Sequence, residues 1–158
     1  MGNKHTSFID SLALSVQRLT QMIGGFDGEL HFRPPAPDEW CIVEIVGHLG
    51  DIESRYRGRF ERIVSEDTPQ VPAIWPSPMP DPLPQLSNVV AVFEHERAKT
   101  VAFLETLALG AWQRGANHAT LGSITLLKQV QGLIDHDEEH LKQILQTLMM
   151  LEVDQRSE

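Results

Sequence analysis

The sequence contains a single cysteine, Cys41, so no disulfide framework can form within one chain. Basic residues are also scarce: 13 Lys and Arg stand against 22 Asp and Glu, and the formal net charge is −9. A chain this acidic repels phosphate backbones and anionic lipid headgroups, so general binding to nucleic acid or to a membrane surface is disfavoured. No apolar run approaches the roughly 20 residues that span a bilayer. The N-terminal residues lack the apolar core of a secretory signal, and we therefore expect a cytoplasmic protein.

What the chain does contain is enough apolar material for one packed domain. Its 158 residues are 41% hydrophobic and 22% charged, which is close to the average of globular proteins. This length is typical of a single domain with its own hydrophobic core. We find no internal repeat and no second domain, and we treat residues 1–158 as one unit.

Four segments repeat apolar residues at spacings of three and four, the pattern of an amphipathic helix, and none shows the sustained alternation of a half-buried strand. The helices are expected over about 6–23, from Asp38 as N-cap to about Ser65, from about Ser87 to just before Gly110, and from Gly122 to about Leu151. Four long amphipathic helices predict an all-α four-helix bundle.

The predicted connection between the second and third helices is unusually long. Seven prolines fall between Pro69 and Pro84, and this density forbids a helix there. We expect a proline-rich crossover that either packs along the bundle or covers one end of it as a lid. A structureless connection of this length is often functional.

Three histidines occupy positions that suit a metal site. His136 and His140 lie four residues apart in the fourth predicted helix, on one face and one turn apart. On a helical wheel this pair lies at the edge of the apolar stripe, and His48 has the same place in the second helix. Three imidazoles with a free coordination position describe an open site for a divalent metal, with zinc or nickel as the expected ion.

Other interpretations of the same residues have to be weighed. An H-x-x-x-H pair is a weak signal, because histidines are common on protein surfaces. The zincin motif H-E-x-x-H is excluded, since Asp137 stands where that motif needs its glutamate base. A di-iron bundle needs two Glu-x-x-His motifs, and the chain contains one related string, 137–140.

Asp137 is the candidate catalytic residue. It falls near the middle of the apolar stripe of its helix, where an ionised carboxylate is costly unless it is paired. Arg97, Arg55 or Arg59 could provide the partner, which would make the interaction structural. A water network around the metal would instead make Asp137 a candidate general base.

An ordered set of short motifs resembles the DinB-like (YfiT-like) superfamily of metalloenzymes. The similarity covers roughly residues 6 to 150, and it is carried by the ordered set more than by any one piece. The matching pieces are Arg33–Trp40, Glu44–Leu49 with Glu53, Phe93 with Arg97, Gly122–Leu126, and His136 and His140–Leu141 with Ile144.

The resemblance implies a four-helix bundle of crossed-over topology that often forms homodimers. It implies that His48, His136 and His140 hold the metal, and that the reaction is a thiol S-transfer or an isomerisation with a low-molecular-weight thiol as cofactor. A divalent cation lowers the pKa of a bound thiol, but it also activates water for hydrolysis. We prefer the thiol transferase for a small-molecule substrate; a metal-dependent hydrolase and a non-enzymatic helical binding or stress-response protein are the alternatives.

Overall fold

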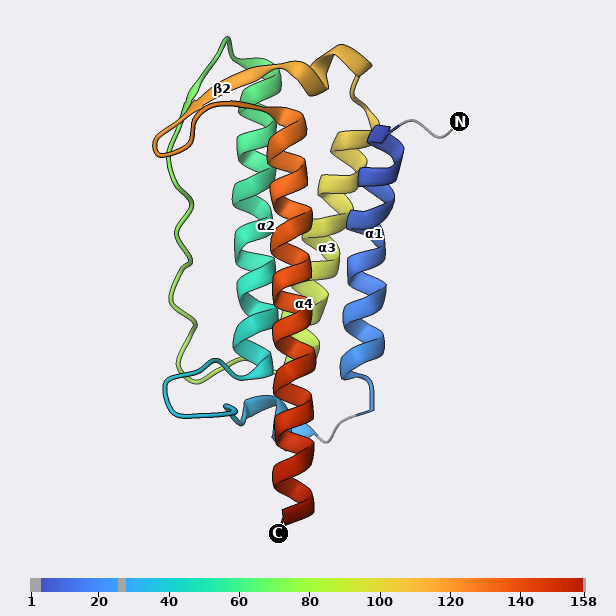
Figure 1. Ribbon diagram of the computed structural model, residues 1–158, viewed down its shortest axis with the longest axis vertical. Helices are drawn as coiled ribbons and strands as arrows, with labels where there is room; N and C mark the ends of the chain where they lie inside the picture. Colours follow the sequence, from blue (N-terminus) through green and yellow to red (C-terminus); the bar gives the residue numbers. More distant parts are fainter. Residues whose placement is uncertain (1–3, 26–27, 158) are drawn as a thin grey trace.

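The computed structural model describes residues 4–25 and 28–157, which fold into a bundle of four α-helices (Figure 1). These are α1 (Lys4–Ile23), α2 (Ile42–Ser65), α3 (Leu86–Glu105) and α4 (Leu126–Ser157). The predicted all-α four-helix bundle is confirmed. No α-helix in the described ranges is both long and apolar enough to cross a membrane.

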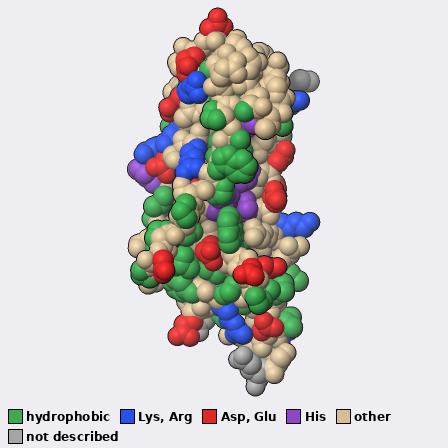
Figure 2. Space-filling model, turned by 90° about the vertical axis from the view of Figure 1, so that its left-hand side faces the viewer, with side chains coloured by type: hydrophobic (Ala, Val, Ile, Leu, Met, Phe, Trp, Pro, Cys, Tyr) green, Lys and Arg blue, Asp and Glu red, His purple; other side chains and the backbone are tan. Residues whose placement is uncertain are grey.

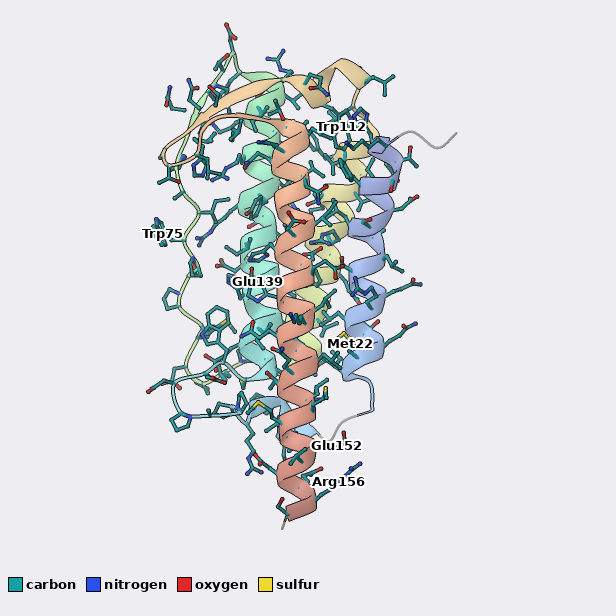
Figure 3. All side chains as sticks on the ribbon, viewed as in Figure 1. Met22, Trp75, Trp112, Glu139, Glu152 and Arg156 are labelled. Atoms are coloured by element: carbon teal, nitrogen blue, oxygen red, sulfur yellow. The ribbon has the colours of Figure 1, made fainter. Side chains whose placement is uncertain are left out.

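The helices do not simply alternate in direction. In Figure 1, α1 and α4 run down the bundle, whereas α2 and α3 both run up it. Since α2 and α3 are consecutive and parallel, residues 66–85 have to return along the length of the molecule. They do so outside α2, to which they are tied by hydrogen bonds from Arg55 to Trp75 O and from Ser77 N to Asp51 Oδ2 (2.8 Å). Figure 3 shows the Trp75 side chain directed away from the bundle.

The expected N-cap of α2 at Asp38 is wrong by three residues. Asp38 has a φ of 66°, in the left-handed region, whereas a helix N-cap adopts an extended backbone. The cap is Cys41, whose backbone N–H donates to Glu44 Oε1 at 3.2 Å. The chain therefore needs one more turn after the prolines of 34–37 before the helix can begin.

A small sheet at one end of the bundle was not expected. Strand β1 (Gln70–Val71) pairs in parallel with β2 (Gly115–His118), which pairs antiparallel with β3 (Gly122–Thr125). The strands are too short to show an alternating pattern, and β1 lies far from β2 in sequence. Two predicted helices are shorter than expected: α3 ends at Glu105 and is followed by a 3-10 helix, η2 (Leu109–Gln113), while α4 begins at Leu126 because residues 122–125 form β3.

The core consists of two apolar clusters separated by a charged layer. One cluster surrounds the first half of α2, and the other surrounds the second half of α2 together with the sheet and Trp112, which Figure 3 labels at the upper end. Between them lies Arg97, whose guanidinium donates to both oxygens of Glu53 (2.6 and 2.9 Å) and of Asp137 (2.7 and 2.9 Å). All three residues are at most 1% exposed.

Candidate metal centre

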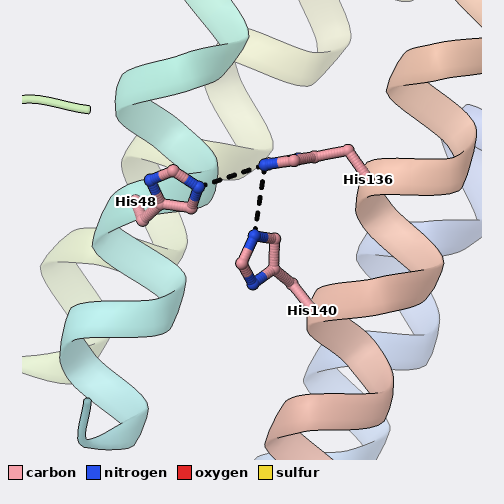
Figure 4. A group of neighbouring side chains, drawn as sticks. All are labelled: His48, His136 and His140. Carbon is pink, nitrogen blue, oxygen red and sulfur yellow. Dashed lines mark hydrogen bonds between the residues drawn. The ribbon is translucent and has the colours of Figure 1, made fainter. Parts of the chain in front are cut away.

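Three histidine side chains from two helices converge at the height of this charged layer. His48 projects from α2, and His136 and His140 project from successive turns of α4 (Figure 4). Nε2 of His136 lies 3.1 Å from Nε2 of His48 and 3.1 Å from Nε2 of His140. The potential ligand nitrogens of all three lie within 4.8 Å of one another. The structure thus brings together the three residues that the sequence selected.

These separations suit a shared cation. Imidazole nitrogens bind zinc at about 2.0–2.1 Å, so two neighbouring ones on one tetrahedral or octahedral ion lie about 2.8–3.4 Å apart. Both separations from His136 fall in this range. The donor set is chemically suitable as well, because neutral imidazole is a good ligand for zinc and nickel.

The hydrogen bond at Nδ1 of His140 also favours metal binding through its Nε2. Nδ1 of His140 lies 2.8 Å from Oε1 of Gln143, and since that oxygen only accepts, the imidazole proton belongs on Nδ1. Nε2 of His140 is then left with its lone pair directed at the cluster. Nδ1 of His48 and Nδ1 of His136 are buried and have no hydrogen-bond partner within the described residues.

Aromatic side chains flank the histidines on both sides. The Trp40 ring lies 5.0 Å from that of His48 and 6.4 Å from that of His140, and the Tyr56 ring lies 6.2 Å from that of His136, all between centroids. Trp40 lines one cavity and Tyr56 lines another, and each of the two has a volume of about 470 Å³. His136 and His140 are half-buried, and Figure 2 shows histidine side chains at the centre of the face turned toward the viewer.

Comparison with known protein families identifies the family of this chain. The sequence matches the family model of the DinB superfamily over residues 11–144. The chain belongs to the DinB superfamily. This confirms the family that the ordered motifs of the sequence indicated. A search of curated proteins finds no match to the chain.

Two solved structures share the DinB-type bundle of this chain. YfiT from Bacillus subtilis, described as a probable metal-dependent hydrolase with an unusual four-helix bundle topology, superimposes with a TM-score of 0.79 at 20% identity, covering 96% of this chain and 90% of its own. TT2238, a four-helix bundle protein, gives a TM-score of 0.62 at 16% identity over 89% of this chain and 98% of its own. At these identities the likeness concerns the fold.

Asp137 lies beside the cluster in sequence but is engaged elsewhere. Both of its oxygens accept hydrogen bonds from Arg97, and the residue is 1% exposed. Of the partners considered for it, Arg97 is the one that the fold provides. Burial by itself lowers the pKa of the Arg97 guanidinium, but the hydrogen bonds and charges of Asp137 and Glu53 outweigh burial and raise it, so Arg97 stays charged. The arrangement supports a structural role for Asp137.

Two residues around the histidines could not be assigned from the sequence. Gln143 lies three residues after His140 on the same face of α4, and this spacing is the signal that could have identified it. Tyr56 belongs to the apolar stripe of α2 and resembles an ordinary core residue there. Glu44, four residues before His48 in α2, is engaged at the start of that helix, where its Oε1 accepts from the backbone N–H of Cys41.

The electrostatics of the cluster keep two imidazoles neutral at pH 7. Burial is the main cause and the neighbouring imidazole of His140 adds to it, and together they lower the pKa of His48 and of His136 from 6.5 to about 4. Neutral imidazole is the form that binds a metal, so no proton has to be displaced from these rings above about pH 5.

The lowered pKa values predict a pH dependence for the metal-free protein. Between pH 6.5 and 4 the unfolded chain binds protons at His48 and His136 that the folded chain does not, so stability falls as pH falls through this window. The melting temperature in the presence of a chelator should therefore drop from pH 6.5 to pH 5. The double variant His48→Gln/His136→Gln should show a clearly smaller drop, and an equal drop in both proteins would contradict the prediction.

Proposed function

We propose that the chain is a metal-dependent enzyme in which His48, His136 and His140 hold one divalent ion, zinc or nickel. The observation that carries the proposal is the approach of three Nε2 atoms from two helices to the spacing of ligands on one ion. The similarity to YfiT, described as a probable metal-dependent hydrolase, supports it.

The composition of the cluster supports a catalytic rather than a structural site. A structural zinc site has four protein ligands, commonly including thiolates. Within the described ranges no carboxylate or thiol joins the three histidines, and Cys41 is buried at the start of α2. Three protein ligands leave room for a small molecule, and a divalent cation lowers the pKa of a thiol or water that occupies this position.

The preferred reaction is transfer of a small-molecule thiol to an electrophilic substrate. A thiol needs no strong protein base once its pKa is lowered, whereas hydrolysis usually recruits an Asp or Glu beside the attacking water. Asp137 is the carboxylate adjacent to the cluster in sequence, and its oxygens are occupied by Arg97. The proposed cleft for this reaction is bordered by the His48 edge of α2 and by the proline-rich segment from Pro69 to Pro84. Homodimerisation and a cytoplasmic location stay predictions.

A metal-dependent hydrolase is the second candidate. The observation that favours it is the description of YfiT, whose structure superimposes over 96% of this chain. In this case Asp137 would have to leave Arg97, or the attacking water would have to lose its proton to another group. The non-enzymatic alternative predicts no metal binding at all.

These candidates are separated by one set of measurements. The protein loaded with zinc or nickel should contain about one equivalent per chain by elemental analysis, and should consume a small thiol in the presence of chlorodinitrobenzene in a metal-dependent manner. Hydrolysis of a nitrophenyl ester that is lost in Asp137→Asn, with metal and fold retained, would favour the hydrolase. Less than half an equivalent of bound metal would refute the whole proposal.

A further inference from the structure

A cavity of about 470 Å³ next to the histidine cluster is lined by hydrogen-bond donors. It lies between α2, the β2–β3 hairpin, α4 and residues 73–74 of the returning segment. Its polar lining includes Arg59, His118 and Lys128, together with Tyr56, and no carboxylate lines it within the described ranges. In a chain of net charge −9, a cavity whose charged lining residues, Arg59 and Lys128, are both cations is unusual.

Arg59 carries a buried positive charge without a counterion. The residue is 7% exposed, and its guanidinium donates to two neutral acceptors, Gln129 Oε1 (2.7 Å) and Pro72 O. In the part of the chain that the structure describes, no carboxylate lies within ion-pair distance of it, whereas Arg97, which is 1% exposed, has two. A buried charge is costly unless an opposite charge accompanies it. Two hydrogen bonds also leave other N–H donors of the guanidinium for a ligand.

His118 presents a further donor, its Nε2–H, because its Nδ1 is occupied as a hydrogen-bond acceptor. Its Nδ1 accepts from the backbone N–H groups of Thr120 and Leu121, both at 3.1 Å. Burial, with the nearby charge of Arg59, lowers the pKa of His118, so the ring is neutral at pH 7 and its proton is on Nε2. Lys128 is exposed and has no ion-pair partner among the described residues. On the upper half of the face in Figure 2, Lys or Arg side chains lie beside a histidine.

The cavity comes near the histidine cluster at Tyr56 and Gly132. Tyr56 lines it, and the Tyr56 ring lies 6.2 Å from that of His136. Gly132 lines it one helical turn before His136, and a Cβ added there would meet no atom within 4 Å. A ligand in the cavity can therefore extend along α4 to the histidines without displacing a side chain of residue 132.

We propose that this cavity binds the oxyanion of a small substrate, a carboxylate or a phosphate, with Arg59 as its main partner and His118 and Lys128 as further donors. The apolar part of the lining, with Ile74, Leu121 and Ile124, suits a hydrocarbon or aromatic body next to the anion. The assignment of this ligand as the enzyme's substrate rests on the proposed function, but binding of the anion does not.

The test is binding of benzoate and inorganic phosphate to the full chain, measured by calorimetry with and without a chelator. Benzamide, which has the shape of benzoate without its charge, is the matched control ligand. We expect Arg59→Gln to weaken benzoate binding at least about 10-fold, as expected for a hydrogen bond to a charged group, and Lys128→Gln about 3-fold. Arg62→Gln removes the same charge from α2 outside this cavity and should change binding less than about 2-fold.

Each outcome has a defined meaning. Arg59 also connects α2 to α4 and to residue 72, so Arg59→Gln could fail to fold. In that case the proposal is tested by Lys128→Gln and by Gly132→Leu, whose new side chain fills the cavity, and both should weaken benzoate binding. Absence of binding by both anions, equal binding of benzamide, or an equal loss in Arg62→Gln would refute the proposal. Loss of benzoate binding in His136→Ala would also refute it, because the anion would then bind at the histidines. Retained benzoate binding in a chain that binds no metal would refute the proposed function alone.

Discussion

Replacing His136 with alanine is expected to abolish tight metal binding. Nε2 of His136 is the central atom of the cluster, 3.1 Å from the corresponding nitrogen of each of the other two histidines. Without it, His48 and His140 remain as two ligands on different helices. We expect the bound metal to fall from about one equivalent to almost none, and the affinity to fall by more than about 100-fold, beyond the loss caused by removing an outer hydrogen bond.

The matched control is His95→Ala, which removes an exposed histidine from α3. It should bind metal as the unaltered chain does, by calorimetric titration with zinc and with nickel. Gln143→Ala should have an intermediate effect of about 10-fold, because it removes only the acceptor that orients His140. Unchanged binding in His136→Ala would show that the metal is held elsewhere or not at all.

Replacing Arg97 with leucine is expected to destabilise the fold strongly. Arg97 neutralises Glu53 and Asp137, and both carboxylates are buried in the charged layer between the two apolar clusters. Removal of the shared cation leaves two like charges without a partner inside the bundle, which costs about 3–5 kcal/mol. For a chain of this size that corresponds to a fall in melting temperature of roughly 10 °C.

The control for this experiment is Arg62→Leu. Arg62 is an exposed residue on the same bundle whose ion pair with Glu66 joins adjacent turns of α2, and its loss should lower the melting temperature by less than about 2 °C. Thermal unfolding followed by circular dichroism measures both variants. If Arg97→Leu were as stable as the unaltered chain, the layer would not contribute to stability. Asp137→Asn keeps the Arg97–Glu53 pair, so its melting temperature should lie between those of Arg97→Leu and Arg62→Leu.

The charged layer and the metal centre are neighbours along α4. Asp137 directly follows His136, and its pairing with Arg97 fixes the rotation of α4 at this turn. The side chain of His136 is thereby turned toward α2, where His48 projects. Asp137, which the sequence suggested as a candidate base, therefore has a structural role. Its buried ion pair with Arg97 positions the turn of α4 that carries His136.

The sequence by itself determined the bundle, the family and the identity of the three histidines. Helices of this length have a periodicity that survives small errors at their ends, and the positions of His48, His136 and His140 at the edges of apolar stripes follow from that periodicity. Helix ends were less predictable. The shift of the α2 N-cap from Asp38 to Cys41 depends on the left-handed backbone of Asp38, and the start of α4 at Leu126 depends on β3, which pairs with β2.

Only the tertiary structure decided which groups meet across the bundle. That Arg97 rather than Arg55 or Arg59 pairs with Asp137 depends on the relative rotation of three helices, which no local pattern encodes. The same holds for Arg59, which the sequence could not distinguish from the other arginines of α2. Its buried, unpaired charge became visible once α4 and the returning segment were placed against it. Periodicity is a local property of the chain, whereas pairing is a property of packed surfaces far apart in sequence.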